Sequence, residues 1–208
     1  MIVGQFNSAP IVTMPSSPGF RSVDWTAASV VGESTSPFTL GQQIQDWQAD
    51  LLTASVEMPP MTRKQAAAWI AFLLQLRGSN GVFLMGDTMS AIPFGVATGT
   101  PVTAGVNAAN STTLATTGWT ASTANILLPG DYVQIGYRLY RCLDAVNTDS
   151  AGNASFNVWP RLRESPPAGT AIVTQNTQGM FRLAKNDASW NESYLTTYGV
   201  TFTVREAI

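Results

Sequence analysis

The chain has 208 residues, of which 45% are hydrophobic and only 12% are charged, and its formal net charge is −2. An ordinary soluble domain carries about 25% charged residues, so uncharged polar side chains must provide most of the wetted surface. The sequence contains no histidine and one cysteine, Cys142, which excludes histidine-based catalytic triads and clusters of thiolate metal ligands. We therefore expect a folded protein that is not an enzyme and that holds no cofactor or metal.

Targeting signals are not expected. Residues 1–7 carry neither a basic leader nor a long apolar stretch, and no run in the chain approaches 18 apolar residues, so neither a cleaved signal nor a membrane-spanning helix is predicted. The isoelectric point near 5.0 argues against nucleic-acid binding through a positive surface. Arginine outnumbers lysine among the basic residues, and its planar guanidinium suits fixed pairing at subunit interfaces.

The first part of the chain predicts short strands separated by turns. Prolines and a glycine between residues 10 and 19 exclude a helix there, and residues 20–26 have the composition of a strand. Ser36-Pro37 breaks the chain again. Residues 52–58 alternate apolar and polar side chains at the period of a half-buried strand, which the double proline at 59–60 ends.

Residues 63–77 are predicted to form a helix of about four turns. Thr62 is a good N-cap, Gln65 completes a capping box, and Gly78 is placed to end the helix in the left-handed conformation. The helix is apolar nearly all round except along one line of small or polar side chains: Lys64, Ala68, Ala71 and Gln75. Such a helix is normally covered on more than one side. The second cover comes either from another subunit or from the chain itself, and the pattern favours neither.

After a short buried strand at 82–85, the segment 91–175 is predicted to form a β-domain of its own. Helix signals disappear and turn markers recur about every ten residues, as in a small antiparallel barrel. We expect residues 131–135 and 138–143 to pair as a hairpin across Gly136-Tyr137, with residues 154–160 as the next neighbour.

The end of the chain, like its beginning, consists of strand-like stretches separated by turns, with strands predicted at 179–183 and 194–204. If both terminal segments share one sheet, the middle of the chain is an insertion. We therefore expect a mainly β fold: a β-sandwich with one α-helix from residues 1–90 and 176–208, and an inserted small antiparallel β-barrel from residues 91–175.

Few residues suggest chemistry. The pairs Asp187 with Glu192 and Asp144 with Asp149 lie in turn-like stretches and are interpreted as solvated carboxylates. The segment 144–153 weakly resembles a calcium loop but lacks the sixth-position glycine and the final glutamate, so a hairpin connection with side chains bonded to their own backbone is preferred. Cys142 lies in a predicted strand and is expected to be a small buried hydrophobe.

The segment 159–167 has two open interpretations. Its prolines hold it extended while Trp159, Arg161 and Arg163 project from it, and these residue types are enriched at protein interfaces. The alternative, which we slightly favour, is an ordinary strand end followed by a rigid exit loop.

The order of these features resembles the distal tail proteins of long-tailed bacteriophages. The resemblance spans about residues 20 to 205, and the order of its motifs carries it rather than any one motif. The motifs are Ser36-Pro37-Phe38-Thr39, residues 56–63 leading into the helical stretch 67–78, residues 81–87, residues 127–135, and residues 139–141 through 158–163.

The resemblance implies a β-sandwich with one helix, assembled as a six-fold ring that joins the tail tube to the tail tip. In some members an oligonucleotide-binding-like barrel is attached outside the ring, which fits the predicted insertion. Larger relatives carry sugar-binding modules, for which this chain is too short. The genome would pass through the ring lumen, and a chain with little positive charge suits such a passage.

The leading prediction is therefore a structural virion protein, located at the tail tip and in the host cytoplasm during assembly. Its expected partners are five further copies of itself, the tail tube protein and the tail-tip hub protein, with no membrane and no sequence-specific nucleic acid. The alternative is a carbohydrate- or receptor-binding module that uses exposed tryptophans such as Trp119, Trp159 or Trp190. Residues predicted at a subunit or partner interface are Lys64, Ala68, Ala71, Gln75, Trp25, Trp159, Arg161 and Arg163.

Overall fold

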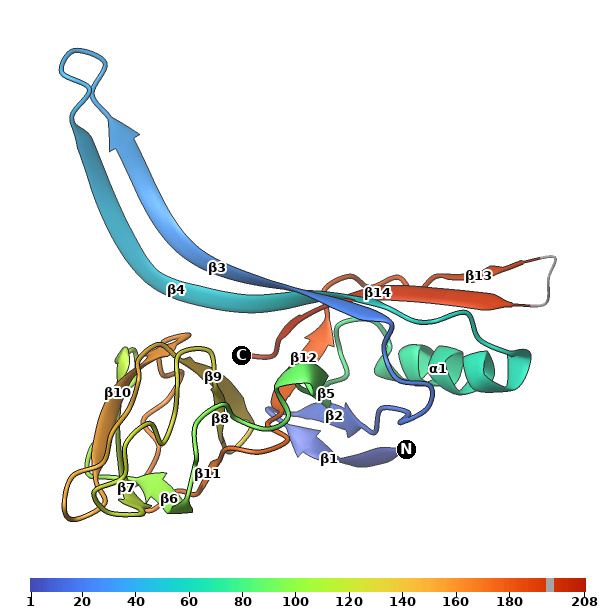
Figure 1. The fold of residues 1–208 in the computed structure, drawn as a ribbon. Helices are drawn as coiled ribbons and strands as arrows, with labels where there is room; N and C mark the ends of the chain where they lie inside the picture. Colours follow the sequence, from blue (N-terminus) through green and yellow to red (C-terminus); the bar gives the residue numbers. More distant parts are fainter. Residues whose placement is uncertain (194–196) are drawn as a thin grey trace. The chain divides into compact units, whose positions relative to one another are not determined.

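The computed structural model describes residues 1–193 and 197–208, and Figure 1 shows a mainly β chain with one α-helix among them. The predicted fold class is confirmed. The elements are β1 (Ile2–Phe6), β2 (Ala9–Val12), β3 (Ser22–Thr35), β4 (Gln42–Glu57), α1 (Arg63–Leu76), β5 (Phe83–Met85), the 3-10 turn η1 (Thr88–Ser90), β6 (Gly99–Thr103), β7 (Thr113–Trp119), β8 (Tyr132–Ile135), β9 (Arg138–Cys142), β10 (Ala154–Trp159), β11 (Ile172–Val173), β12 (Gly179–Leu183), β13 (Trp190–Glu192) and β14 (Tyr198–Glu206).

The chain divides into two compact units. Unit 1 consists of Met1–Thr26, Leu52–Asp87 and Gln178–Ile208, and unit 2 consists of Ala27–Leu51 and Thr88–Thr177. The sequence predicts one domain from residues 1–90 and 176–208 and another from 91–175, whereas in the structure residues 27–51 group with the middle of the chain and the other boundaries fall at 87/88 and 177/178. The reason for the first difference is that residues 27–51 make their long-range polar contacts with the segment that follows β10.

Unit 1 is built on a sheet with the strand order β3-β4-β14-β12-β5, with β13 paired to β14 and a separate two-stranded sheet β1-β2. The alternating residues of β4 and β14 send one face inward, as the period-two pattern at 52–58 predicts. The core contains an aromatic group in which Trp69 packs against Phe72 and Phe202 at ring-centroid distances of 5.8 and 6.2 Å. Phe72 in turn meets Phe83 edge-on at 5.1 Å.

Helix α1 begins and ends almost where the sequence predicts. Thr62 is the N-cap, and the Gln65 side chain accepts hydrogen bonds from the Thr62 amide at 3.1 Å and from its hydroxyl at 2.9 Å. The helix ends one residue early, because Arg77 itself adopts the left-handed conformation with φ +50°. Gly78 follows with φ +69°, and a Cβ there would lie 2.9 Å from the backbone of Asn186. Position 78 therefore favours glycine for two reasons, its positive φ angle and the lack of room for a Cβ.

Unit 2 contains a six-stranded antiparallel sheet with the order β11-β8-β9-β10-β7-β6. An isolated bridge between Val102 and Ala171 joins the two edges, and the Thr103 amide donates to the Thr170 carbonyl at 2.9 Å, so the sheet is a nearly closed barrel. The predicted hairpin is confirmed by the pairing of Ile135 with Arg138, and β10 pairs with β9 as its neighbour.

The barrel core is apolar and includes the cysteine. Leu114, Ile126, Leu127 and Leu162 are fully buried in it, together with Cys142. Burial raises the pKa of the Cys142 thiol to about 11, which confirms the prediction of a buried hydrophobe. No helix in the described residues has the length and apolar character needed to cross a membrane.

The turn predicted at 144–153 bonds its own backbone, as expected. The Asp149 carboxylate accepts hydrogen bonds from the amides of Ala151 and Asn153 at 2.8 Å and from the Asn153 side chain at 2.9 Å. These contacts, led by those from Asn153, lower the pKa of Asp149 below its usual 3.8.

Several strands escaped sequence prediction. The structure adds β1, β2, β6, β7, β11 and β13, and it extends the strands predicted at 20–26 and 52–58 far toward the Ser36–Gly41 turn. The strand predicted at 194–204 is observed from Tyr198 onward as β14. Its first three residues lie outside the described residues.

Candidate interaction site

The most unusual surface of unit 2 is the hairpin formed by Ala27–Leu51, which we call the arm. Figure 1 shows it as the blue and cyan curved ribbon of β3 and β4. Its side chains are exposed on both faces apart from a few, among which Asp50 is the one fully buried residue. Six large apolar side chains are exposed along it: Val30, Val31, Phe38, Leu40, Ile44 and Trp47. A two-stranded ribbon without a covered face is marginally stable in water at best, so the arm needs support.

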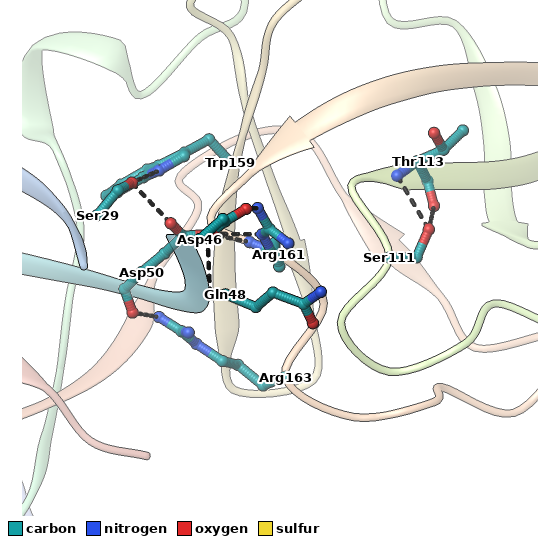
Figure 2. Close-up of polar contacts among 9 residues, drawn as sticks. All are labelled: Ser29, Asp46, Gln48, Asp50, Ser111, Thr113, Trp159, Arg161 and Arg163. Carbon is teal, nitrogen blue, oxygen red and sulfur yellow. Dashed lines mark hydrogen bonds and ion pairs between the residues drawn. The ribbon is translucent and has the colours of Figure 1, made fainter. Parts of the chain in front are cut away.

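Support comes from a polar cluster that joins the arm to residues 159–163, which we call the clamp: Ser29, Asp46, Asp50, Trp159, Arg161 and Arg163 (Figure 2). Asp50 is its centre and is 6% exposed. One carboxylate oxygen accepts the Ser29 hydroxyl at 2.7 Å, and the other accepts the Arg161 amide at 3.0 Å. Because buried charges are tolerated only when they are paired and hydrogen-bonded, these donors fix Asp50 to the start of the exit segment after β10.

The second carboxylate of the clamp is placed by an irregularity in β4. Gln48 has φ +57°, and its amide donates to Asp46 at 2.8 Å. A residue in the left-handed conformation within a strand re-aims its neighbours, and Asp46 forms an ion pair with the Arg161 guanidinium. A Cβ on Gly32 would lie 2.8 Å from the Trp47 indole nitrogen, so any larger residue at position 32 would displace the indole from its observed place.

Arg163 and Trp159 complete the clamp from the same exit segment. The Arg163 guanidinium donates to the Asp50 carbonyl at 2.7 Å, and the Trp159 indole donates to Ser29 at 3.4 Å. Three residues predicted at an interface, Trp159, Arg161 and Arg163, are therefore brought together on the arm of their own unit. The segment contacts the arm of its own chain, and its role at a subunit or partner interface stays a prediction.

In the clamp, hydrogen-bond donors and the Arg161 guanidinium surround the carboxylates of the arm. The Gln48 amide, followed by the Arg161 guanidinium, holds the pKa of Asp46 below its usual 3.8. Arg161 also lies with its Nε 3.7 Å from Asp50. Both carboxylates are thus engaged by donors, so this arrangement binds and orients the arm.

Sequence reasoning missed Ser29, Asp46 and Asp50. A weak signal existed, because the arm contains three acidic residues, Glu33, Asp46 and Asp50, and no lysine or arginine. Nothing in the sequence pairs these three residues with the segment that begins at Trp159, 109 positions after Asp50.

The remaining predicted interface residues lie in unit 1. Lys64, Ala68, Ala71 and Gln75 are exposed along the outer face of α1, and Trp69, Phe72 and Leu73 are buried on the inner face. The helix is therefore covered on one side by its own unit, and Leu74 on the outer face is 57% exposed. Trp25 is half-buried, with its ring centroid 5.7 Å from that of Phe181.

The tryptophans of the binding-module alternative are dispersed. Trp119 is buried in the barrel core, where its indole donates to the Thr116 hydroxyl at 2.8 Å. Trp159 is held in the clamp, and Trp190 is a partly exposed residue of unit 1. Among the described residues, no group of three or more acidic or cysteine side chains is placed to hold a metal ion.

A scan of the sequence against protein-family models found no match, and a search of curated proteins likewise found none.

Proposed function

We propose that this chain is a structural protein of a bacteriophage tail, which forms a hexameric ring between the tail tube and the tail-tip hub. The observation that carries the proposal is the arm. It exposes six large apolar side chains on a ribbon that has no covered face of its own. Large apolar side chains gathered in the open on one element are typical of protein interaction sites.

The second support is the outer face of α1, which is small, apolar and exposed over Ala68, Ala71 and Leu74. The arm and this face belong to different units of the chain. A contact between two different surfaces of identical subunits is heterologous, and such contacts form closed rings when the rotation between neighbours closes. A ring therefore follows more naturally from these two surfaces than a two-fold dimer does.

The third support is the resemblance itself. Its motifs include Ser36-Pro37-Phe38-Thr39 in the turn of the arm, the stretch that forms helix α1, and residues of the β8–β9 hairpin, in that chain order. The low charge of the chain, 12% with a net charge of −2, agrees with a surface that is largely contacted by neighbours and with a lumen that does not bind the passing genome.

The test is the mass of the purified protein across a concentration series. Six copies of the 22.2 kDa chain would weigh about 133 kDa. We expect that mass at the higher concentrations, together with the chain in purified tails and at the tip in immunolabelled electron micrographs. A protein that stays monomeric throughout and is missing from the tails would contradict the proposal.

A further inference from the structure

Unit 1 contains an open hollow of about 700 Å³ beside the C-terminal end of α1. Its lining combines apolar side chains with one guanidinium: Met1, Ile2, Pro10, Leu74, Gln75, Arg77 and Asn80. Ile2 and Leu74 are exposed apolar residues of this lining. Pockets that bind ligands have volumes of about 300 to 1,000 Å³, so the hollow is large enough for an aromatic ring together with a leucine side chain.

The turn of the arm offers such a pair. Phe38 is 95% exposed and Leu40 is 77% exposed. The turn is held in shape by backbone hydrogen bonds from the Ser36 amide to the Gly41 carbonyl at 2.9 Å and from the Leu40 amide to the Ser36 carbonyl at 3.0 Å. Because a preformed turn loses little conformational entropy on binding, Phe38 is presented as a ready hydrophobic anchor.

The charges of the two surfaces are complementary. The hollow is lined by Arg77 and by no carboxylate, and Arg77 forms no ion pair with any residue that the structure describes. The arm is purely acidic, and with Asp46 engaged by Arg161 and Asp50 buried, Glu33 remains as its exposed charge three residues before the turn. The two units differ in charge in the same sense. Unit 1 has seven basic and six acidic residues, whereas unit 2 has four basic and seven acidic residues.

The arm is also long enough. Nine residues of β3, from Ala27 to Thr35, belong to it. At about 3.3 Å per residue they extend about 30 Å, which is the diameter of a small domain. A copy of the chain placed beside the first is therefore within reach of the turn.

We propose that Phe38 and Leu40 of one copy insert into the hollow beside Leu74 and Arg77 of a second copy. This contact rests on the proposed ring and specifies which surfaces join its subunits. Glu33 of the incoming arm lies on the side of the interface that carries Arg77, and the clamp holds the arm in the geometry needed for docking. Repetition of this heterologous contact around the ring leaves each copy with one donated turn and one occupied hollow.

Disulfide trapping between separately tagged copies tests the contact. One copy carries Phe38→Cys and the other carries Leu74→Cys, both on a Cys142→Ala background, so that a disulfide can form only between chains. A matched control replaces Leu74→Cys with Val106→Cys, because Val106 is 91% exposed and belongs to unit 2. We expect the first mixture to form mixed disulfides at least ten times faster than the control mixture.

Equal rates in the two mixtures would overturn the contact. So would preferential pairing of Phe38→Cys with itself, which would indicate that two arms meet around a two-fold axis. In a single chain that carries both cysteines, a product of monomer mass alone would indicate that the turn docks within its own chain, and would also overturn the proposal.

Charge and size variants give a second measurement. Leu74→Asp places a carboxylate in the hollow opposite an acidic arm, so we expect it to raise the subunit dissociation constant at least tenfold, and more than Leu74→Ser does. Both substitutions are at an exposed site, and the circular dichroism spectrum should be unchanged. If the mass still shows a hexamer and neither variant weakens it, the docking contact is wrong and the ring stands. If the wild-type chain forms no hexamer and is absent from tails, the proposed function itself is wrong.

Discussion

The carboxylate of Asp50 and the backbone amide of Arg161 are 111 residues apart in the chain and form a 3.0 Å hydrogen bond. This one contact ties the arm to the barrel exit segment, and the Arg161 side chain then returns to Asp46 on the same strand. Asp50 and Arg161 are therefore the residues on which the position of the arm depends most directly.

Replacement of Asp50 tests this dependence. Asp50→Ala leaves the Arg161 amide and guanidinium without their buried acceptor, and we expect the free energy of unfolding to fall by about 2 to 3 kcal/mol, since breaking a buried pair is strongly destabilising. Asp50→Asn keeps an acceptor for Ser29 and should cost less. Urea denaturation gives the free energies, and hydrogen exchange should rise first in residues 27–51. The exposed Asp24→Ala serves as the control, for which a change within about 0.5 kcal/mol is expected.

The ionisation of Asp46 predicts how the clamp responds to acid. Its pKa in the folded state is depressed, mainly by the Gln48 amide and then by Arg161. A depressed pKa means that the stabilising contribution is present above the usual value of 3.8 and is lost as the pH falls through the lower folded value. Carboxyl chemical shifts should follow this titration. The protection of the arm amides relative to their intrinsic exchange rate should fall below about pH 4, and Asp46→Asn should remove that part of the response. A pKa for Asp46 at or above the usual value would contradict the described contacts.

The thiol of Cys142 should be inert in the folded protein. Burial raises its pKa from 9.0 to about 11, and two pKa units lower the thiolate fraction at pH 8 about a hundredfold. Reaction with a thiol reagent should therefore be at least that much slower in the folded chain than in urea. A matched exposed thiol, Leu143→Cys on a Cys142→Ala background, should react at the unfolded rate. Fast labelling of folded wild type would refute the buried placement.

Two glycines of unit 2 separate torsional strain from steric crowding. Gly152 and Gly169 have φ +78° and +84°, but a Cβ on Gly152 would lie 2.3 Å from the Trp119 carbonyl oxygen, while a Cβ on Gly169 would meet nothing within 4 Å. Gly169→Ala should cost about 1 kcal/mol, and Gly152→Ala about 2 to 4 kcal/mol because the backbone must also move. Thermal denaturation of both variants measures the difference. Equal losses would show that crowding at Gly152 is relieved without cost.

Local signals allowed much of the fold to be predicted. The helix was found because Pro60, Thr62 and Gly78 mark its ends within the sequence, and the β8–β9 hairpin because two short apolar runs flank Gly136. The arm was missed for a physical reason. A strand exposed on both faces shows no alternation of apolar and polar residues, and Val30 and Val31 are both exposed although they point to opposite faces.

The candidate site was half predicted. Arg161 and Arg163 stood out because arginine and tryptophan are enriched at protein interfaces and the prolines hold their segment extended. Their partners Ser29 and Asp50 could not be identified, since pairing across more than a hundred residues depends on how the barrel closes rather than on any local pattern. The capped helix fixes which residues share a face, and the four residues of the outer line of α1 are exposed together; their role at a subunit interface stays a prediction.

The arm is attached to the barrel by polar interactions, whereas the side chains that it exposes are hydrophobic. The Asp46–Arg161 ion pair is half exposed at the aspartate, so dissolved salt screens it, whereas strongly hydrated ions such as sulfate strengthen the burial of side chains like Phe38 and Trp47. Added sulfate therefore weakens the ion pair between Asp46 and Arg161 and strengthens the burial of the apolar side chains at the turn of the arm. In a concentrated sulfate solution the arm should be less firmly attached at Asp46, while its exposed turn has a stronger tendency to be buried.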